Sequence, residues 1–361
     1  MEKKERNFAP RFSMIDMIRG CACIVIVLYH YYGVAGTTFI FEKSPLMKSV
    51  IVNGNYAVDL FFMLSGFCLC ANYRDRLVER QISYKKFLIR HYLKFVSYMA
   101  LTMPLALIKQ WLMYKNGWDV KPTLDGILFD LFCIRTGYGI TQTFPYNSAL
   151  WFICVLGLMY LFYTCVCAVA SKSKTVYFVA CSVMLLLGWA LLSRQVSFFV
   201  FQEITGRGCC NFFLGTIMYE IYEFYRERKS AAVNMMGITF AGIVIFVISS
   251  NYDLCGDSRI AADLFLFVPL VLMASFMPRI ENKILDLLIK LAGLATSVYI
   301  WHHPIIYLFS GLAAMNVLPG EMNHLSMFVI VLTVVAVVAV ISKCFLEKAV
   351  YQKLLTLTLF H

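Results

Sequence analysis

Long runs of apolar residues are the feature that most constrains what this chain can fold into. Nearly uninterrupted runs occupy residues 155–170, 177–192 and 327–341. A helix of about twenty apolar residues crosses about 30 Å of hydrocarbon, because each residue adds about 1.5 Å to its length. Hydrophobic residues make up 60% of the 361 residues and charged residues only 15%, which leaves too little polar surface for a soluble protein. The pattern predicts an integral membrane protein that has the lipid bilayer as its solvent.

The hydropathy pattern fits ten helical spans. It predicts an all-α polytopic fold in which one bundle, and one domain, fills residues 1–361. The expected spans are 14–33, 51–72, 87–110, 147–170, 175–193, 208–225, 231–250, 260–278, 288–312 and 325–345. With a cytoplasmic N-terminus, most of the 32 lysines and arginines fall on the cytoplasmic side, as they do in membrane proteins generally. We therefore expect both termini in the cytoplasm of a multi-pass cell-membrane protein. The net charge of +11 then reflects orientation and not nucleic-acid binding.

The first span carries three ionisable residues, and each needs a reason because charge inside hydrocarbon is costly. Arg19 and His30 are eleven residues apart. At about 100° per residue this separation places both on one helix face, about 16 Å apart along the axis. Asp16 precedes Arg19 by three residues and is expected to pair with it. A polar stripe of this kind predicts a face that lines the protein interior or a water-filled cavity.

A second polar cluster lies in the ninth span, at Ser297–Pro304. It contains Tyr299, Trp301, His302 and His303. Both this span and the first are expected to begin on the cytoplasmic side, so His302 and His30 should lie at similar depth. Pro304 cannot donate a backbone hydrogen bond, and we expect the helix to bend there and make room for a ligand.

Two further groups stand out at membrane depth. Asp59 in the second span is an intramembrane carboxylate that requires a partner. Ser65 and Gly66, later in the same span, are small residues that permit close helix approach. Arg90 and Lys94 lie where the basic 73–86 loop enters the third span. They are interpreted either as orientation anchors or as a site for the phosphates of a cytoplasmic nucleotide-containing donor.

These segments, taken in order, resemble the motifs of the acyltransferase-3 family. The resemblance is carried by Ile15–Gly20 with Leu28–His30 (LDxxRG…H), Val58–Phe67 (VDLFFxLSGF), Ser148–Phe152 (LWFL), Asn211–Gly215 (FFLGM) and Ser297–His302 (SxYLWH). Trp151 of the third motif is not followed by the acidic SxExQFY pattern of many glycan-modifying members, so the chain is similar to variants that lack that acid.

The resemblance implies transfer of an acyl group, usually acetyl from cytoplasmic acetyl-CoA, to a hydroxyl of a cell-surface glycan, a lipid-linked sugar or a similar acceptor. It implies no permanently bound cofactor, and the sequence predicts no metal site. The implied catalytic residues are His30, Arg19 and His302, and the implied substrate-binding residues are Asp16, Asp59, Arg90, Lys94, Trp151, Tyr299, Trp301 and His303.

The mechanism expected from this assignment starts with acyl-CoA, which docks near Arg90 and extends along the stripe headed by Arg19. His30 acts as the general base on the acceptor hydroxyl or takes the acyl group itself, and His302 assists. A different reading of a buried polar stripe is a membrane transporter, or a translocator of acyl-modified substrates without transferase activity.

Overall fold

The computed structural model describes residues 12–35, 43–118, 121–140, 143–170, 173–194, 198–228, 230–252, 258–278, 282–317 and 324–359. Within these residues the secondary structure is helical, with one isolated bridge between Phe198 and Phe201. The α-helices are α1 (Ser13–Ala35), α2 (Pro45–Val52), α3 (Ala57–Val78), α4 (Tyr84–Lys115), α5 (Leu124–Leu131), α6 (Trp151–Ala170), α7 (Lys174–Arg194), α8 (Glu203–Tyr225), α9 (Ala231–Tyr252), α10 (Ser258–Ala261), α11 (Val268–Phe276), α12 (Lys283–Ala292), α13 (Ala295–Ala314), α14 (His324–Ile341) and α15 (Glu347–Leu359). The 3₁₀ turns η2 (Gly54–Tyr56) and η3 (Ser148–Leu150) lead into α3 and α6, and the π-helical turns η4 (Ala262–Phe267) and η5 (Ser342–Leu346) join α10 to α11 and α14 to α15.

Within the described ranges, six helical segments are long and apolar enough to cross a membrane. They are Ser13–Ala35, Gly54–Val78, Ser148–Ala170, Lys174–Arg194, Arg259–Phe276 and Leu325–Thr356. A seventh span arises if α12 and α13, which meet at an angle of 51°, are taken together. The chain is therefore a multi-pass membrane protein. The other expected spans also form helices, but α4 contains Lys94 and Lys109, and α8 contains charged residues at both ends, so their apolar character is lower.

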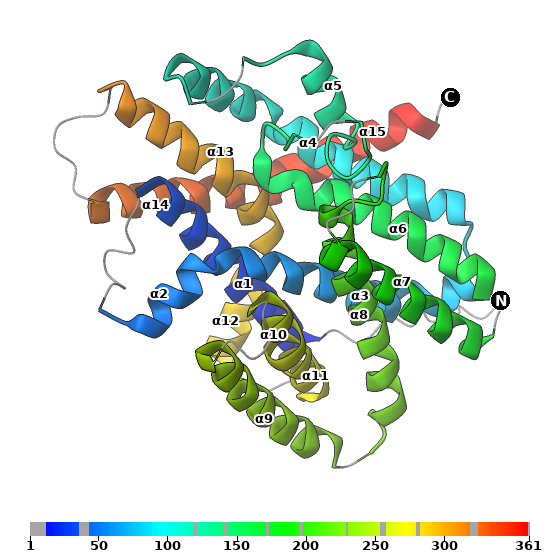
Figure 1. The fold of residues 1–361 in the computed structure, drawn as a ribbon. Coiled ribbons are helices and arrows are strands. Elements are labelled where there is room, and N and C mark those ends of the chain that lie inside the picture. Colours follow the sequence, from blue (N-terminus) through cyan, green and yellow to red (C-terminus); the bar gives the residue numbers. More distant parts are fainter. Residues whose placement is uncertain are drawn as a thin grey trace.

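The helices that matter most for the candidate site are packed around α1 and α3 (Figure 1). The first of these, α1, contacts α3, α12 and α13, whereas α3 packs along α8, and α4 contacts α13 and α15. In Figure 1, α9, α10 and α11 are grouped together beside this central set. The arrangement brings the two polar clusters of the sequence, on α1 and α13, against each other.

The sequence predicted a bend at Pro304, but the helix is not interrupted at this residue. Helix α13 runs through Pro304 as one element, and the 51° bend lies ten residues earlier, at Gly293 and Leu294 between α12 and α13. A proline leaves the carbonyl four residues before it without its usual helix partner. Here that carbonyl, of Ile300, accepts a hydrogen bond of 2.8 Å from Nδ2 of Asn147. A side chain from outside the helix thus compensates for the missing backbone donor.

Two glycines allow α3 and α8 to approach closely. A Cβ atom added at Gly66 would overlap the carbonyl oxygen of Phe212, and one added at Gly215 would overlap that of Met63. The small-residue step noted in the sequence at Gly66 therefore lies at a backbone-to-backbone helix contact.

We expect Gly66→Ala to destabilise the protein by about 1–3 kcal/mol, because the new methyl group forces the two helix backbones apart. The matched control is Gly237→Ala in α9, where an added Cβ meets no atom within 4 Å. The control is expected to be neutral or slightly stabilising, since alanine is the better helix former. Thermal unfolding of both variants in detergent measures the difference, and equal midpoints for the two would contradict the packing argument.

Candidate active site

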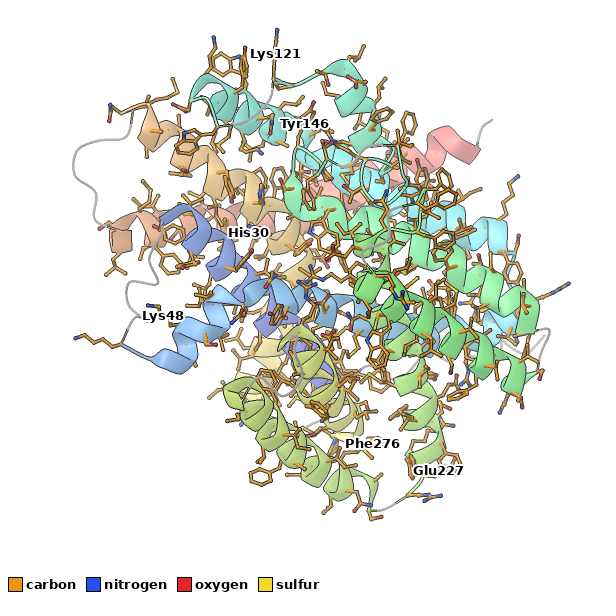
Figure 2. The ribbon with its side chains drawn as sticks, in the orientation of Figure 1. His30, Lys48, Lys121, Tyr146, Glu227 and Phe276 are labelled. Carbon is orange, nitrogen blue, oxygen red and sulfur yellow. The ribbon has the colours of Figure 1, made fainter. Side chains whose placement is uncertain are left out.

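Three histidine rings meet near the middle of the molecule, where α1 and α13 pack together (Figure 2). The ring centroid of His30, on α1, lies 5.1 Å from that of His302 and 5.1 Å from that of His303, both on α13. This proximity confirms the similar depth that the sequence predicted for His30 and His302. His302 and His303 are buried, and His30 is partly exposed. The three imidazoles therefore exchange protons with one another or with a bound molecule more readily than with bulk water.

The protonation pattern of His302 follows from its hydrogen bond. Its Nδ1 lies 2.7 Å from the carbonyl oxygen of Tyr299. A carbonyl oxygen only accepts, so Nδ1 carries the hydrogen, and in the neutral ring Nε2 is the nitrogen with the free lone pair. That Nε2 is buried and has no hydrogen-bond partner among the described residues, and the same holds for Nδ1 of His303. Buried polar atoms are normally hydrogen-bonded, so these two nitrogens indicate a place for a ligand or a proton.

A cavity of about 340 Å³ opens beside these histidines, and we call it the His30 cavity. It is lined by Ile26, Tyr29, His30, Asn55, Val58, Phe144, Ser148, Ala149, Trp151, Ile204, Arg207, His303 and Tyr307. Among these residues Arg207 carries the only permanent charge. The cavity thus combines two imidazoles, one guanidinium and several neutral polar groups.

A second cavity, of about 280 Å³, contains Arg19, and we call it the Arg19 cavity. Nη1 of Arg19 donates to Oδ1 of Asp16 at 3.2 Å, which confirms the pairing expected from the sequence, and Nη2 lies 3.4 Å from Sγ of Cys68. The remaining lining is largely aromatic and apolar. Arg19 and His30 therefore line two different cavities on the length of α1 and do not meet.

A third cavity, of about 980 Å³, is larger than these two and strongly basic, and we call it the basic cavity. Its lining includes Arg76, Lys86, Arg90, Lys94, Lys343 and Lys348, together with one carboxylate, Glu347. It shares Tyr73, His91, Lys94 and Tyr98 with the Arg19 cavity, so the two adjoin. A concentration of fixed positive charge next to a narrower, aromatic channel suits a ligand that has phosphates at one end and an uncharged arm at the other.

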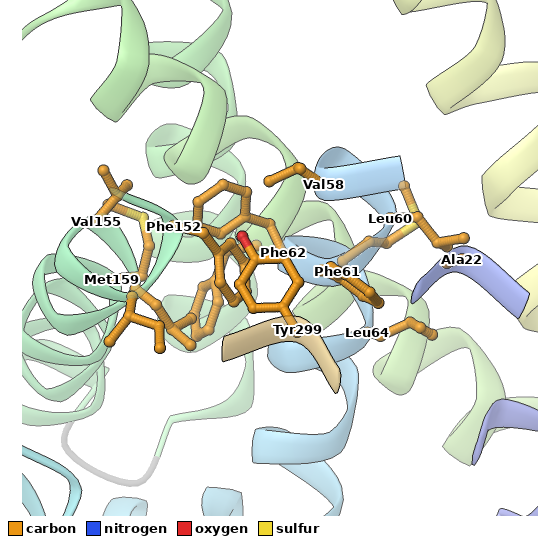
Figure 3. Close-up of a cluster of buried hydrophobic side chains, with 14 of the residues drawn as sticks. Ala22, Val58, Leu60, Phe61, Phe62, Leu64, Phe152, Val155, Met159 and Tyr299 are labelled. Atoms are coloured by element: carbon orange, nitrogen blue, oxygen red, sulfur yellow. The ribbon is translucent and has the colours of Figure 1, made fainter. Parts of the chain in front are cut away.

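A group of aromatic side chains lies in the wall of the Arg19 cavity, and Figure 3 shows Phe61, Phe152 and Tyr299 packed in the buried core. The rings of Phe61, Phe152 and Tyr299 have centroids 5.5–6.1 Å apart, and all three residues line the Arg19 cavity. The hydroxyl of Tyr299 donates to the carbonyl oxygen of Ala149 at 2.6 Å, and Ala149 lines the His30 cavity. The ring centroid of Tyr299 is also 5.6 Å from that of His302. The inner end of the Arg19 cavity therefore reaches the histidines across this one aromatic layer.

Asp59 has the partner that its depth in the membrane required. Its carboxylate accepts hydrogen bonds from Nε and from Nη2 of Arg207, the second at 2.9 Å, and Nε of Arg259 lies 3.8 Å from Oδ2. The side chain of Asp59 is fully buried and lines none of the three cavities. Arg207 and Arg259 each lie one residue before an expected span, 208–225 and 260–278, so the hydropathy pattern puts both outside the membrane. The need of Asp59 for a buried cation is the sequence signal that points to them.

The other expected site residues are divided between the cavities. Arg90 and Lys94 line the basic cavity, and Trp151 and His303 line the His30 cavity. Trp301 is buried next to His302 but lines none of the three cavities, and its indole Nε1 has no hydrogen-bond partner among the described residues. Sequence reasoning also missed Glu347, whose carboxylate accepts a hydrogen bond from Ser297 at the start of α13.

The basic cavity adjoins the Arg19 cavity, and Tyr299 in the wall of the Arg19 cavity lies beside His302. This arrangement suits the movement of an activated group from a charged carrier to a base. The family model for an acyltransferase domain, acyltransferase 3, matches residues 12–343. The chain belongs to the acyltransferase-3 family. It is accordingly an enzyme that transfers an acyl group from a donor to an acceptor, and not a transporter without transferase activity. Searches of curated proteins and of solved structures find no significant match.

Proposed function

We propose that this acyltransferase moves an acetyl group from cytoplasmic acetyl-CoA to a hydroxyl of a cell-surface glycan, a lipid-linked sugar or a similar acceptor. The acceptor oxygen forms a bond to the acetyl carbonyl carbon, and the carbon–sulfur bond of the thioester breaks. The hydroxyl proton passes to a base and then to the departing thiolate, so that the products are an acetyl ester and free CoA. The thioester is already activated, and a base with a donor to the developing oxyanion suffices.

In this proposal the donor occupies the basic cavity and the Arg19 cavity. Arg90 and Lys94 bind the phosphates of CoA, since guanidinium and ammonium groups form charge-assisted hydrogen bonds with phosphate oxygens. The uncharged pantetheine arm then extends along the Arg19 cavity, between Arg19, held by Asp16, and the aromatic residues that include Tyr299. This placement brings the thioester to the aromatic layer beside His302.

His30 is the proposed general base, because it is the histidine of α1 that faces the cavity on the other side of that layer. His302 assists through its unpartnered Nε2, as a base for His30 or a site for its proton. His303 and Trp151, both in the wall of the His30 cavity, bind the acceptor, and buried Trp301 supports the histidines from α13. A transient acyl-histidine on His30 is the two-step form of the same chemistry.

The proposed topology follows from the same assignment. All ten expected spans cross the membrane, including the less apolar α4 and α8 and the shorter apolar stretch Ala231–Val247 of α9. Both termini lie in the cytoplasm of a cell-membrane protein. The lysines and arginines of the basic cavity then face the cytoplasm, where acyl-CoA is made, in agreement with the usual bias of positive charge. The His30 cavity lies toward the opposite face.

The observation that carries the proposal is the continuity of the basic cavity with the Arg19 cavity, whose wall includes Tyr299, with its ring centroid 5.6 Å from that of His302. The test is transfer of label from [¹⁴C]acetyl-CoA in membranes that contain the wild type, Arg19→Ala or His30→Ala, with extracts divided into glycan, lipid and small-molecule fractions. We expect label in one fraction with the wild type and its loss with both variants. Labelling that is equal in all three preparations would rule out this function.

The basic cavity gives a separate prediction for the donor. Arg90→Ala combined with Lys348→Ala is expected to raise the KM for acetyl-CoA about 10- to 100-fold with a smaller change in kcat, because two charge-assisted contacts to phosphate are removed. Higher salt should weaken donor binding to the wild type more than to the double variant. Lys115→Ala is the control, since Lys115 lies at the far end of α4 beside Trp111. An unchanged KM in the double variant would place the donor elsewhere.

A further inference from the structure

We infer that Arg207 is an acceptor-binding residue in the His30 cavity and that Asp59 is its positioning residue. The inference rests on the proposed function, because it takes the His30 cavity as the acceptor site. Arg207 lies outside the family motifs identified in the sequence. Asp59 acts on the acceptor only through the guanidinium of Arg207.

The orientation of Arg207 is fixed by bonds on two of its nitrogens. Nε and Nη2 donate to the carboxylate of Asp59 from α3, and Nη2 also donates to the backbone carbonyl oxygen of Asn55. The guanidinium carbon lies 5.3 Å from the ring centroid of Trp151, which gives a cation–π contact with a second helix. A long side chain held at this many points loses little further freedom when it binds a ligand.

The third nitrogen of Arg207 is left for a ligand. Nη1 has no hydrogen-bond partner within the residues that the structure describes. The side chain is 12% exposed and lines the His30 cavity, whereas Asp59 is 0% exposed and does not line it. The cavity therefore meets the donor side of this ion pair and not its carboxylate.

The chemistry of the lining indicates what Nη1 binds. Among the residues that the structure describes, no carboxylate lines the His30 cavity. The side chains of Asn55 and Ser148, which do line it, make no hydrogen bond to any of these residues. Because one edge of the guanidinium is already taken by Asp59, Nη1 suits a single oxygen atom better than a two-pronged clamp on a carboxylate. The site accordingly fits a hydroxyl-rich, neutral or anionic acceptor and disfavours one that carries an ammonium group.

A second ion pair between the same two helices, outside the three cavities named above, provides the comparison. Arg74 on α3 donates to both oxygens of Glu220 on α8, at 2.6 and 2.7 Å. This pair joins α3 to α8 as Asp59 and Arg207 do, with the charges exchanged between the helices, and it lines none of the three cavities. If helix joining were the whole role of Arg207, loss of either pair would have the same effect on the enzyme.

The test uses full-length protein in detergent, and the acceptor is the host membrane fraction that the wild type labels. The acceptor is titrated at saturating acetyl-CoA, and acetyl-CoA is titrated at saturating acceptor. Both titrations are made for the wild type, Arg207→Lys, Asp59→Asn and Arg74→Lys. Arg207→Ala would leave the buried carboxylate of Asp59 with less positive charge beside it. The second probe of the site is therefore the double variant Asp59→Asn with Arg207→Gln, which removes both charges.

We expect Arg207→Lys and the double variant to raise the KM for the acceptor about 10- to 100-fold, with the KM for acetyl-CoA within about twofold of the wild type. Asp59→Asn should shift the acceptor KM in the same direction by a smaller factor, and Arg74→Lys should leave it unchanged. The inference would be overturned if the acceptor KM were unchanged in Arg207→Lys, or if Arg74→Lys raised it equally. Transfer by the wild type would still support the proposed function in either case. A wild type that labels no fraction would instead remove the proposed function, and this inference with it.

Discussion

His30→Ala is expected to lower kcat about 10²- to 10⁴-fold, the usual cost of removing a general base. The KM for acetyl-CoA should change little, because His30 lines the His30 cavity and not the two cavities assigned to the donor. Initial rates of CoA release and of acceptor labelling, measured over a range of acetyl-CoA concentrations at saturating acceptor, give both constants.

The matched control for this variant is Tyr31→Phe, one residue further along α1. Tyr31 is buried against Phe328 and lines none of the three cavities. The Tyr31→Phe variant should retain near-normal turnover, which would show that α1 tolerates substitution at this depth. Near-normal turnover by stably expressed His30→Ala would exclude His30 as the base and would direct attention to His303, the other histidine in the cavity wall.

Asp59→Ala is expected to reduce stability by about 3–5 kcal/mol, the range seen when one partner of a buried ion pair is removed. The alanine leaves Arg207 without its main acceptor and Arg259 without a carboxylate 3.8 Å away. The midpoint of thermal unfolding in detergent should fall clearly below that of the wild type, and expression should fall with it.

A double-mutant cycle separates the pair from its surroundings. Asp59→Asn combined with Arg207→Gln replaces both charges by neutral side chains of similar size, so it should be far less destabilising than Asp59→Ala. The single variants of the cycle are Asp59→Asn and Arg207→Gln. If their losses of stability added up to the loss in the double variant, Asp59 and Arg207 would not act as a pair in the folded protein.

Sequence reasoning located the helices and the polar clusters because both are local patterns. The stripe of Asp16, Arg19 and His30 depends only on helix periodicity, and the pairing of Asp16 with Arg19 follows from a spacing of three residues. The similar depth of His302 and His30 followed from the shared orientation of their spans. These features needed no knowledge of how the helices pack, whereas the contact between the two rings depends on the packing of α1 against α13.

The parts that could not be predicted depend on contacts between distant segments. Arg207 reaches Asp59 across 148 residues, and Asn147 caps the carbonyl of Ile300 across 153. Neither contact leaves a periodic signal in the chain. The break in the ninth span at Gly293 has the same character. Sequence favours Pro304 as the bend, but a tertiary hydrogen bond makes that proline tolerable and the helix continues.

The separation of Arg19 from His30 into two cavities is the finding that most changes the expected mechanism. The spacing predicted one continuous stripe, whereas the aromatic layer of Phe61, Phe152 and Tyr299 lies between its two ends. In the proposed function, Arg19 therefore contacts the donor arm and His30 contacts the acceptor. The two substrates then bind on opposite sides of the aromatic layer.

The central claim is that the donor enters from the cytoplasmic face and the acceptor from the other. Its most direct test adds [¹⁴C]acetyl-CoA, which does not cross membranes, to the outside of sealed inverted vesicles and of sealed right-side-out vesicles that contain the wild-type protein. Labelled acceptor should appear with inverted vesicles, whose cytoplasmic face and basic cavity meet the donor, and should be lost when the vesicles contain His30→Ala. Equal labelling of right-side-out vesicles, with the seal verified, would contradict the account.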